Sequence, residues 1–130
     1  MSINIREILA SGSITASAPC RIDMGGTLDL STFYIPLRFL KPCTFNMALS
    51  LRTIARIEAW EQGRVRVASK GFKSAVFQSG QAPFNHPLGF MFAVANYFNA
   101  DGISITIESS SPPRSALGGS SSAAVALVAA

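Results

Sequence analysis

The sequence predicts one α+β domain, in which a mostly antiparallel sheet carries two or more helices on one face. Three observations favour this class. Short segments alternate apolar and polar residues, apolar residues recur at helical spacing after His86-Pro87, and an Ile-alternating segment leads through a Gly/Ser-rich stretch into an apolar run. A chain of 130 residues also has the size of a single domain with a real hydrophobic core.

In the first part of the chain, residues 3–10 favour a short helix or an irregular arm. Residues 13–18 predict a short strand that Pro19 ends. Residues 33–41 are apolar and contain Pro36, which predicts a buried but irregular crossing.

The middle of the chain is rich in β-branched residues. We predict strands over 45–50 and 53–60, and a hairpin turn at 61–63 that pairs the second strand with a return strand over 65–68. Residues 73–78 predict one further short strand.

The last part of the chain predicts a helix from His86 to about residue 99, closed by Asp101-Gly102. His86 is the only histidine, and its place before Pro87 favours a structural or solvent-facing residue over a catalytic base. Ile at every second position over residues 103–107 predicts a strand. The final apolar run has no helix-ending signal, so we expect the chain to stop within a helix, as the N-terminal piece of a longer protein.

Composition narrows the classes of function. The chain is 48% hydrophobic and 14% charged, which argues against disorder. Its net charge of +4 comes from scattered basic residues without a Lys/Arg run, so no nucleic-acid partner is expected. No signal peptide is recognisable, and the one long apolar run is too short to span a bilayer. We therefore expect a cytoplasmic protein without a membrane partner.

The two cysteines, Cys20 and Cys43, have neither CxxC spacing nor partner histidines, which argues against a zinc site or a redox motif. A disulfide between them and two free thiols both stay open, and buried free thiols are the expected outcome.

The stretch from Pro112 to Ala124 is the strongest candidate for chemistry. Small residues let backbone N–H groups approach an anion, and the first turn of the following helix offers unpaired N–H donors and a positive dipole end. The stretch is neither a lysine-containing P-loop nor a GxGxxG loop. Its serine hydroxyls could also ligate Mg²⁺. The alternative is an ordinary Gly/Ser turn in which Ser120 caps the helix.

Residues 113–124, placed after an Ile-alternating strand, resemble the phosphate-loop motif of the GHMP kinase superfamily, which includes galactokinase, homoserine kinase, mevalonate kinase and heptose phosphate kinases. In that motif a Pro and three residues precede Gly-Leu-Gly-Ser-Ser-Ala; here Ala116 replaces the first Gly and Gly119 the first Ser. The resemblance implies ATP as the phosphate donor, with the Mg²⁺-contacting serine falling on Ser120. The implied phosphate-binding residues are Pro113, Ala116, Leu117, Gly118, Gly119, Ser120, Ser121 and Ser122.

A second segment, residues 18–29, resembles the first motif of the superfamily in its sugar-kinase form. There an Ala-Pro-x-Arg strand leads into Gly-Gly and a sugar-binding Asp, and these positions fall on Arg21 and Asp29, with a spacing one residue shorter than in the sugar kinases. Asp23 is a second candidate for binding substrate. The resemblance gives Arg21 a catalytic role, the stabilisation of developing negative charge. From the residues alone, an ion pair of Arg21 with either aspartate, or turn capping by these aspartates, remains the alternative.

The resemblance implies a fold like ribosomal protein S5 domain 2, with residues 1–130 as the N-terminal, ATP-binding domain. It places a catalytic Asp, a third Gly-rich motif and a C-terminal domain beyond residue 130. The implied activity is ATP-dependent phosphoryl transfer to a small-molecule hydroxyl, with a sugar or sugar phosphate as the expected acceptor and no turnover by this piece alone. A non-catalytic nucleotide- or ligand-binding relative, or a nucleic-acid-binding domain of the same fold, are the alternatives.

Overall fold

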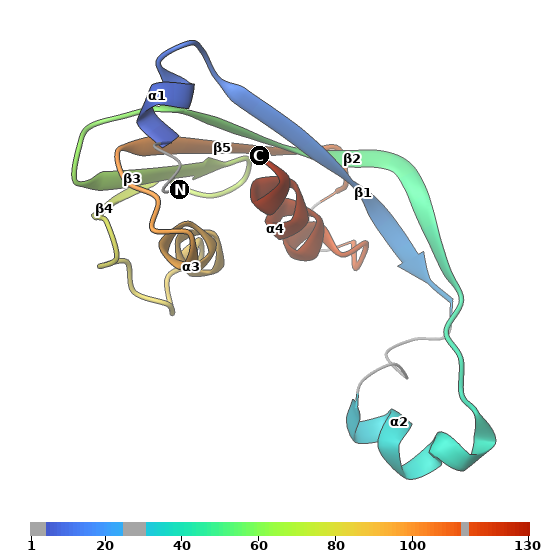
Figure 1. The fold of residues 1–130 in the computed structure, drawn as a ribbon. Helices are drawn as coiled ribbons and strands as arrows, with labels where there is room; N and C mark the ends of the chain where they lie inside the picture. Colours follow the sequence, from blue (N-terminus) through green and yellow to red (C-terminus); the bar gives the residue numbers. More distant parts are fainter. Residues whose placement is uncertain (1–4, 25–30, 113–114) are drawn as a thin grey trace.

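A computed structural model describes residues 5–24, 31–112 and 115–130. Its sheet has five strands in the order β1-β2-β5-β3-β4 (Figure 1). The strands are β1 (Ile14–Asp23), β2 (Asn46–Ala59), β3 (Arg64–Ser69), β4 (Ala75–Gln78) and β5 (Ile103–Ser109). Every neighbouring pair is antiparallel except β3 with β5, which is parallel, so the predicted mostly antiparallel sheet is confirmed.

Helices cover one face of this sheet. The helical segments are α1 (Ile5–Leu9), α2 (Ser31–Leu37), the 3₁₀ helix η1 (Arg38–Leu40), α3 (Gly89–Tyr97) and α4 (Gly119–Ala129). Figure 1 shows α3 and α4 side by side beneath the strands, and they also contact each other. The predicted α+β class is confirmed.

The core lies between the strands and these two helices. Ile105 of β5 is opposite Ile57 of β2 on one side and Val67 of β3 on the other, and all three side chains are at most 4% exposed. Phe92 of α3 and Leu127 of α4 belong to the same buried cluster. The isoleucines at every second position, which predicted a strand over 103–107, are therefore the residues of β5 that face this core.

The predicted hairpin at residues 61–63 is wrong. The chain does turn there, with Gly63 at φ 77°, but β5 lies between β2 and β3. Backbone hydrogen bonds at the start of β5 hold it in place: Trp60 N–H donates to Gly102 O (2.7 Å), and Gly102 N–H donates to Arg64 O (3.0 Å). The local pattern identified the strands and the turn, whereas the pairing is decided by a third strand that follows about 40 residues later in the sequence.

Pro19 does not end the first strand. β1 continues through it to Asp23, with a shift of register between Pro19 and Arg21. β1 is the edge of the sheet, where a residue without an N–H donor can be accommodated. Its partner β2 is likewise longer than predicted, because the segments expected as two strands form one strand of 14 residues.

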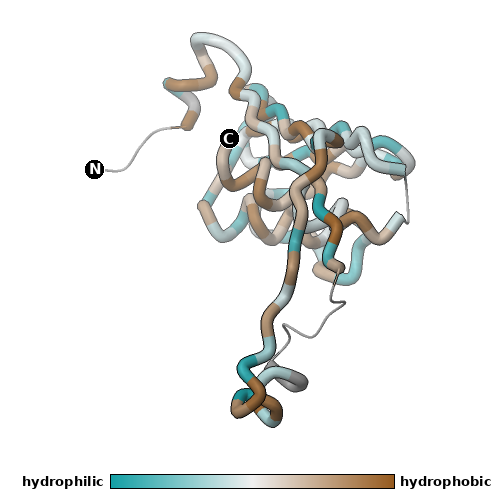
Figure 2. Tube along the Cα trace, turned by 90° about the vertical axis from the view of Figure 1, so that its right-hand side faces the viewer, coloured by the Kyte–Doolittle hydropathy of each residue, from teal (hydrophilic) through white to brown (hydrophobic). Residues whose placement is uncertain are grey.

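The end of β1, the beginning of β2, and α2 with η1 between them form an arm (residues 21–24 and 31–48) that projects from the body (Figures 1 and 2). The predicted buried crossing over 33–41 is wrong, since Phe39 and Leu40 are 73% and 65% exposed. Other large apolar side chains on the arm are exposed as well, namely Ile22, Met24, Tyr34, Ile35, Leu37, Phe45 and Met47.

His86 has a structural role, one of the two outcomes that its position before Pro87 favoured. Its Nδ1 accepts a hydrogen bond from Leu88 N–H (3.1 Å), and its ring packs edge-on against Phe77 and Phe92. The helix that follows begins at Gly89 and not at His86.

Both cysteines are free thiols, but only Cys20 is buried, so the expectation is correct for Cys20 and wrong for the exposed Cys43. No helix in the described ranges has the length and apolar character needed to cross a membrane.

Substitution of Ile105 by Ala tests the central position of β5. Because the side chain is fully buried between two strands and the helices, we expect a loss of about 3 kcal/mol in the free energy of unfolding. Urea denaturation measures it. The control is Val76→Ala on the outer side of β4, where the side chain is 43% exposed and the expected change stays within about 0.5 kcal/mol. Equal effects at the two positions would contradict the assigned core.

Candidate functional site

The candidate site is the start of α4 with the loop that leads into it from β5. Gly118 is the N-cap of α4, with φ 71° and ψ 30°, and no side chain in the described part of the chain caps the helix by a hydrogen bond. Glycine suits this left-handed conformation. Helix geometry leaves the N–H groups of Gly119, Ser120 and Ser121 without intrahelical acceptors, so the helix end presents donors that fit an anion.

The serines of the first turn point in different directions. Ser120 and Ser121 are exposed, whereas Ser122 is buried. Ser122 donates twice to Gly118 O, from its hydroxyl (2.7 Å) and from its N–H (2.8 Å). The alternative in which Ser120 caps the helix is therefore wrong, because Gly118 is the N-cap and Ser120 is exposed in the first turn.

Ala116, which stands where the superfamily motif has its first glycine, adopts φ 58°. A residue with a Cβ atom in this left-handed region costs about 1–2 kcal/mol relative to the right-handed one. The backbone at this position thus has the left-handed conformation that favours glycine, although this chain carries an alanine there.

The two motifs, which are far apart in the sequence, meet in the structure. Arg21 N–H donates to Leu117 O (3.3 Å), which joins the first motif on β1 directly to the loop. A Cβ atom on Gly118 would lie 3.8 Å from Cγ of Arg21. The Arg21 side chain therefore begins beside the N-cap of α4.

Arg21 also lies near Asp23, with Nη2 4.0 Å from Oδ2, and the two side chains are 54% and 16% exposed. The alternative of an ion pair with this aspartate is thus present in the structure. The guanidinium is half-exposed and its separation from the carboxylate is long for an ion pair, so it remains accessible to a bound anion. Asp29 and Pro113, the remaining predicted site residues, lie outside the described residues.

Sequence reasoning missed a group of polar side chains beneath the loop, in which Cys20 is fully buried. Its Sγ lies 3.7 Å from Ser122 Oγ and 3.9 Å from Thr53 Oγ1. Burial raises the pKa of the Cys20 thiol, but hydrogen bonds with Ser122, Ser111, Thr53 and Ser109 outweigh it, so the pKa lies below its ordinary value. The only sequence signal was the run of three serines before Pro112.

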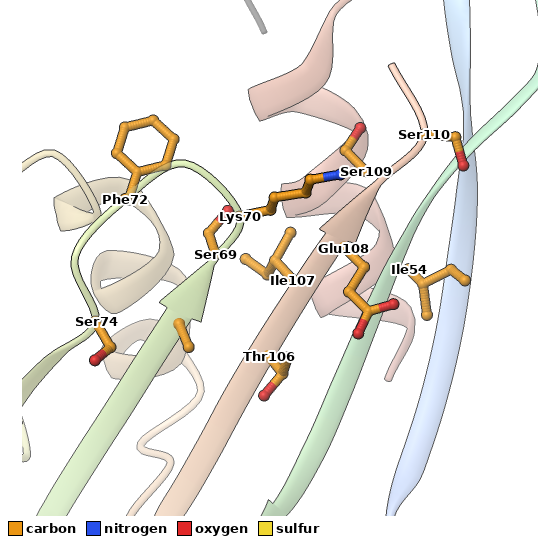
Figure 3. Close-up of a pocket in the computed structure, with 11 residues that line it drawn as sticks. Ile54, Ser69, Lys70, Phe72, Ser74, Thr106, Ile107, Glu108, Ser109 and Ser110 are labelled. Atoms are coloured by element: carbon orange, nitrogen blue, oxygen red, sulfur yellow. The ribbon is translucent and has the colours of Figure 1, made fainter. Parts of the chain in front are cut away.

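A hollow of about 640 Å³ opens on the outer face of the sheet, next to the beginning of the loop (Figure 3). Thr106 and Glu108 of β5 form part of its floor, and Lys70 and Phe72 come from the turn after β3. The other lining residues are Ile54, Ala68, Ser69, Ser74, Ile107, Ser109 and Ser110. Ser109 and Ser110 connect this hollow to the loop, which follows them directly in the chain.

No three His, Cys, Asp or Glu side chains of the described ranges come together as a metal-binding group. Metal-binding groups that the loop itself offers are hydroxyl oxygens, of which those of Ser120 and Ser121 are exposed.

The family described as GHMP kinases N terminal domain matches residues 85–130, the segment that holds α3, β5, the loop and α4. The predicted resemblance is confirmed over this segment. No curated protein matches the sequence.

Solved structures share the fold of nearly the whole chain. A D-glycero-D-manno-heptose 1-phosphate kinase from Bacteroides thetaiotaomicron superposes with a TM-score of 0.71 and 21% identity, covering 88% of this chain and 39% of its own. The mevalonate kinase of Methanococcus jannaschii gives 0.69 and 15%, covering 90% and 38%. The galactokinase of Lactococcus lactis, complexed with galactose, gives 0.65 and 13%, covering 95% and 35%. The present chain therefore spans less than two fifths of the length of each of these proteins.

Substitution of Ala116 by Gly tests the strain in the loop. We expect the free energy of unfolding to rise by about 0.5–1 kcal/mol, because relief of the left-handed strain exceeds the extra entropy of an unfolded glycine. Thermal unfolding measures the change. Ala124→Gly inside α4 is the control and should lower the free energy of unfolding by about 1 kcal/mol. The same sign for both variants would mean that Ala116 is not strained.

Proposed function

We propose that this chain, which over residues 85–130 matches the GHMP kinase N-terminal domain family, is the nucleotide-binding part of an ATP-dependent small-molecule kinase. Residues 1–130 would form its N-terminal domain, and a C-terminal domain would supply the catalytic Asp and the third Gly-rich motif. The coverage of at most 39% of the similar kinases supports this division. We expect the chain alone to bind Mg·ATP without turning over a substrate.

The observation that carries the proposal is the start of α4 after its N-cap Gly118, where no side chain of the described residues caps the helix by a hydrogen bond. Backbone N–H groups and the exposed hydroxyls of Ser120 and Ser121 are donors of the kind that phosphate oxygens need, and the helix dipole adds a favourable field. The group that the family implies, ATP with Mg²⁺, therefore fits these residues. When bound, Mg²⁺ neutralises charge on the phosphates and orients them.

Arg21 would contribute a positive charge next to the proposed phosphate site. Its backbone N–H bonds to Leu117 O, and its side chain, which carries a permanent positive charge, begins beside Gly118. Such a charge can stabilise the negative charge that builds up on a phosphoryl group during transfer. Asp23, and Asp29 by its place in the motif, would accept hydrogen bonds from the hydroxyls of the acceptor.

For the acceptor we propose a sugar or a sugar phosphate. Support comes from the sugar-kinase form of the first motif, and from the heptose 1-phosphate kinase and galactokinase among the similar structures. The carboxylate of Asp23 beside Arg21 suits a ligand that carries several hydroxyl groups.

The hollow on the outer face is our candidate for the nucleotide base. It opens where β5 runs into the loop, so a nucleotide whose phosphates lie at α4 could extend its base across Ser110. Phe72 offers an aromatic surface for stacking, and hydroxyl and carboxylate groups line the floor.

Substitution of Ser120 by Ala tests the metal site. We expect the affinity for Mg·ATP to fall by about tenfold, because a metal ligand is lost, while the affinity for ATP without Mg²⁺ falls much less, because the backbone N–H donors remain. Isothermal titration calorimetry with and without Mg²⁺ measures both. Ser11→Ala, at the end of α1, is a control far along the chain from the loop. Equal Mg·ATP affinity in Ser120→Ala and the wild type would remove Ser120 from the metal site.

Substitution of Phe72 by Ala tests the base site. We expect weaker binding of Mg·ATP, by about three- to tenfold, because a stacking surface is removed, and unchanged binding of Mg·tripolyphosphate, which has no base. Phe84→Ala is the matched control, since Phe84 is also exposed but does not line this hollow. A variant that loses affinity for both ligands equally would place the base elsewhere.

A further inference from the structure

A continuous chain of polar side chains runs under the loop. Ser111 Oγ lies 3.0 Å from Ser109 Oγ, which lies 3.0 Å from Thr53 Oγ1. Thr53 Oγ1 is 3.9 Å from Cys20 Sγ, and Ser122 Oγ is 3.7 Å from the same sulfur. We call these five side chains the polar chain. They come from β1, β2, β5, the beginning of the loop and α4.

The polar chain replaces aliphatic core at one end of the sheet. On β2 the fully buried positions are Thr53, Ala55 and Ile57, all at most 4% exposed, and only the one nearest the loop carries a hydroxyl. On β5 the inward-facing isoleucines likewise give way to Ser109, the register partner of Thr53. Buried hydroxyls require hydrogen-bond partners, whereas aliphatic side chains would fill the same space without them. Simple packing therefore does not account for these residues.

Both ends of the loop are attached to the polar chain. Ser111 precedes the loop and also donates its N–H to Ser109 Oγ (3.3 Å). Ser122 follows the loop and holds Gly118 O with its hydroxyl. A Cβ atom on Gly119 would lie 3.7 Å from Ser111 Oγ, so the two ends also approach each other.

The polar chain also determines where Arg21 begins. Cys20 contributes its sulfur to the polar chain, and the next residue donates its backbone N–H to Leu117 O. A shift of Cys20 relative to Thr53 and Ser122 would thus move the arginine relative to the loop.

We propose that Thr53, Ser109 and Ser122 are positioning residues, which through the polar chain hold the loop and the start of α4 in their anion-binding arrangement. They are not expected to touch the ligand. The proposal rests on the proposed function for the identity of the ligand, but the arrangement of the loop can be measured without one.

The test compares Thr53→Val, which keeps the shape of the side chain and removes its hydroxyl, with Thr53→Ser, which keeps the hydroxyl. Ile57→Val is the matched control, since it is a buried position on the same strand and face without a polar partner. The readout is amide hydrogen exchange of the 130-residue chain without ligand, followed residue by residue by NMR.

We expect Thr53→Val to accelerate exchange at the amides of Arg21 and Ser122 by tenfold or more, because these amides bond to Leu117 O and Gly118 O of the loop. Exchange at Ile105 should change no more than in Ile57→Val. Thr53→Ser should restore slow exchange at both loop-bound amides. A purely structural role would instead accelerate exchange at Arg21, Ser122 and Ile105 together, and that result would overturn the proposal.

Binding separates this proposal from the proposed function. Titration of the same variants with Mg·ATP should give about tenfold weaker affinity for Thr53→Val and wild-type affinity for Thr53→Ser. If the wild-type chain bound no Mg·ATP, the proposed function would fail, and the exchange data alone would decide whether the polar chain positions the loop. If Thr53→Val does not fold, Ser109→Ala interrupts the polar chain at a half-buried position and gives the same comparison by amide exchange, the readout that needs no ligand.

Discussion

The position of the candidate site depends on the burial of only one face of the sheet. In the body of the sheet, away from the arm, the inward-facing side chains pack against α3 and α4, while the opposite face stays open to solvent. α4 packs on β1 and β2 through alanines, of which Ala126 is completely buried. Small residues allow a helix to approach a sheet closely. That approach brings the N-terminus of α4 to the point where β1 carries Arg21, so the packing of the core and the geometry of the site have a common cause.

The proposed anion site would use backbone and hydroxyl groups where many anion sites use lysine. Gly118 and Gly119 remove side chains from the helix start, and the neighbouring serines add donors without adding charge. The permanent charge comes from Arg21 on another element. Donors that are fixed by a helix need little rearrangement when an anion binds, whereas a long charged side chain must lose rotamer freedom. The arrangement of the first turn therefore depends on what supports it from below.

Local patterns in the sequence predicted the positions of strands and helices better than they predicted which strands pair with each other. The Ile alternation and the Gly/Ser stretch predicted β5, the loop and α4, because burial on one face and a helix start leave marks within a few residues. The hairpin after β2 was wrong because pairing depends on a strand distant in sequence, and the break at Pro19 was wrong because an edge strand tolerates proline. The arm was expected to be buried from its apolar composition alone. The polar chain could not be predicted, since single serines and a cysteine acquire their role only where separate strands meet.

The insertion of β5 between β2 and β3 also sets an order for folding. During synthesis, β2 and β3 are complete while residues 103–109 have yet to be made, so each has an unpaired edge facing the gap that β5 will fill. The sheet becomes continuous only when this late segment enters, and its contacts with β2 close a loop of about 45 residues. The nascent chain therefore passes through a stage with two open edges, and the loop that carries the candidate site is formed by the same segment that closes them.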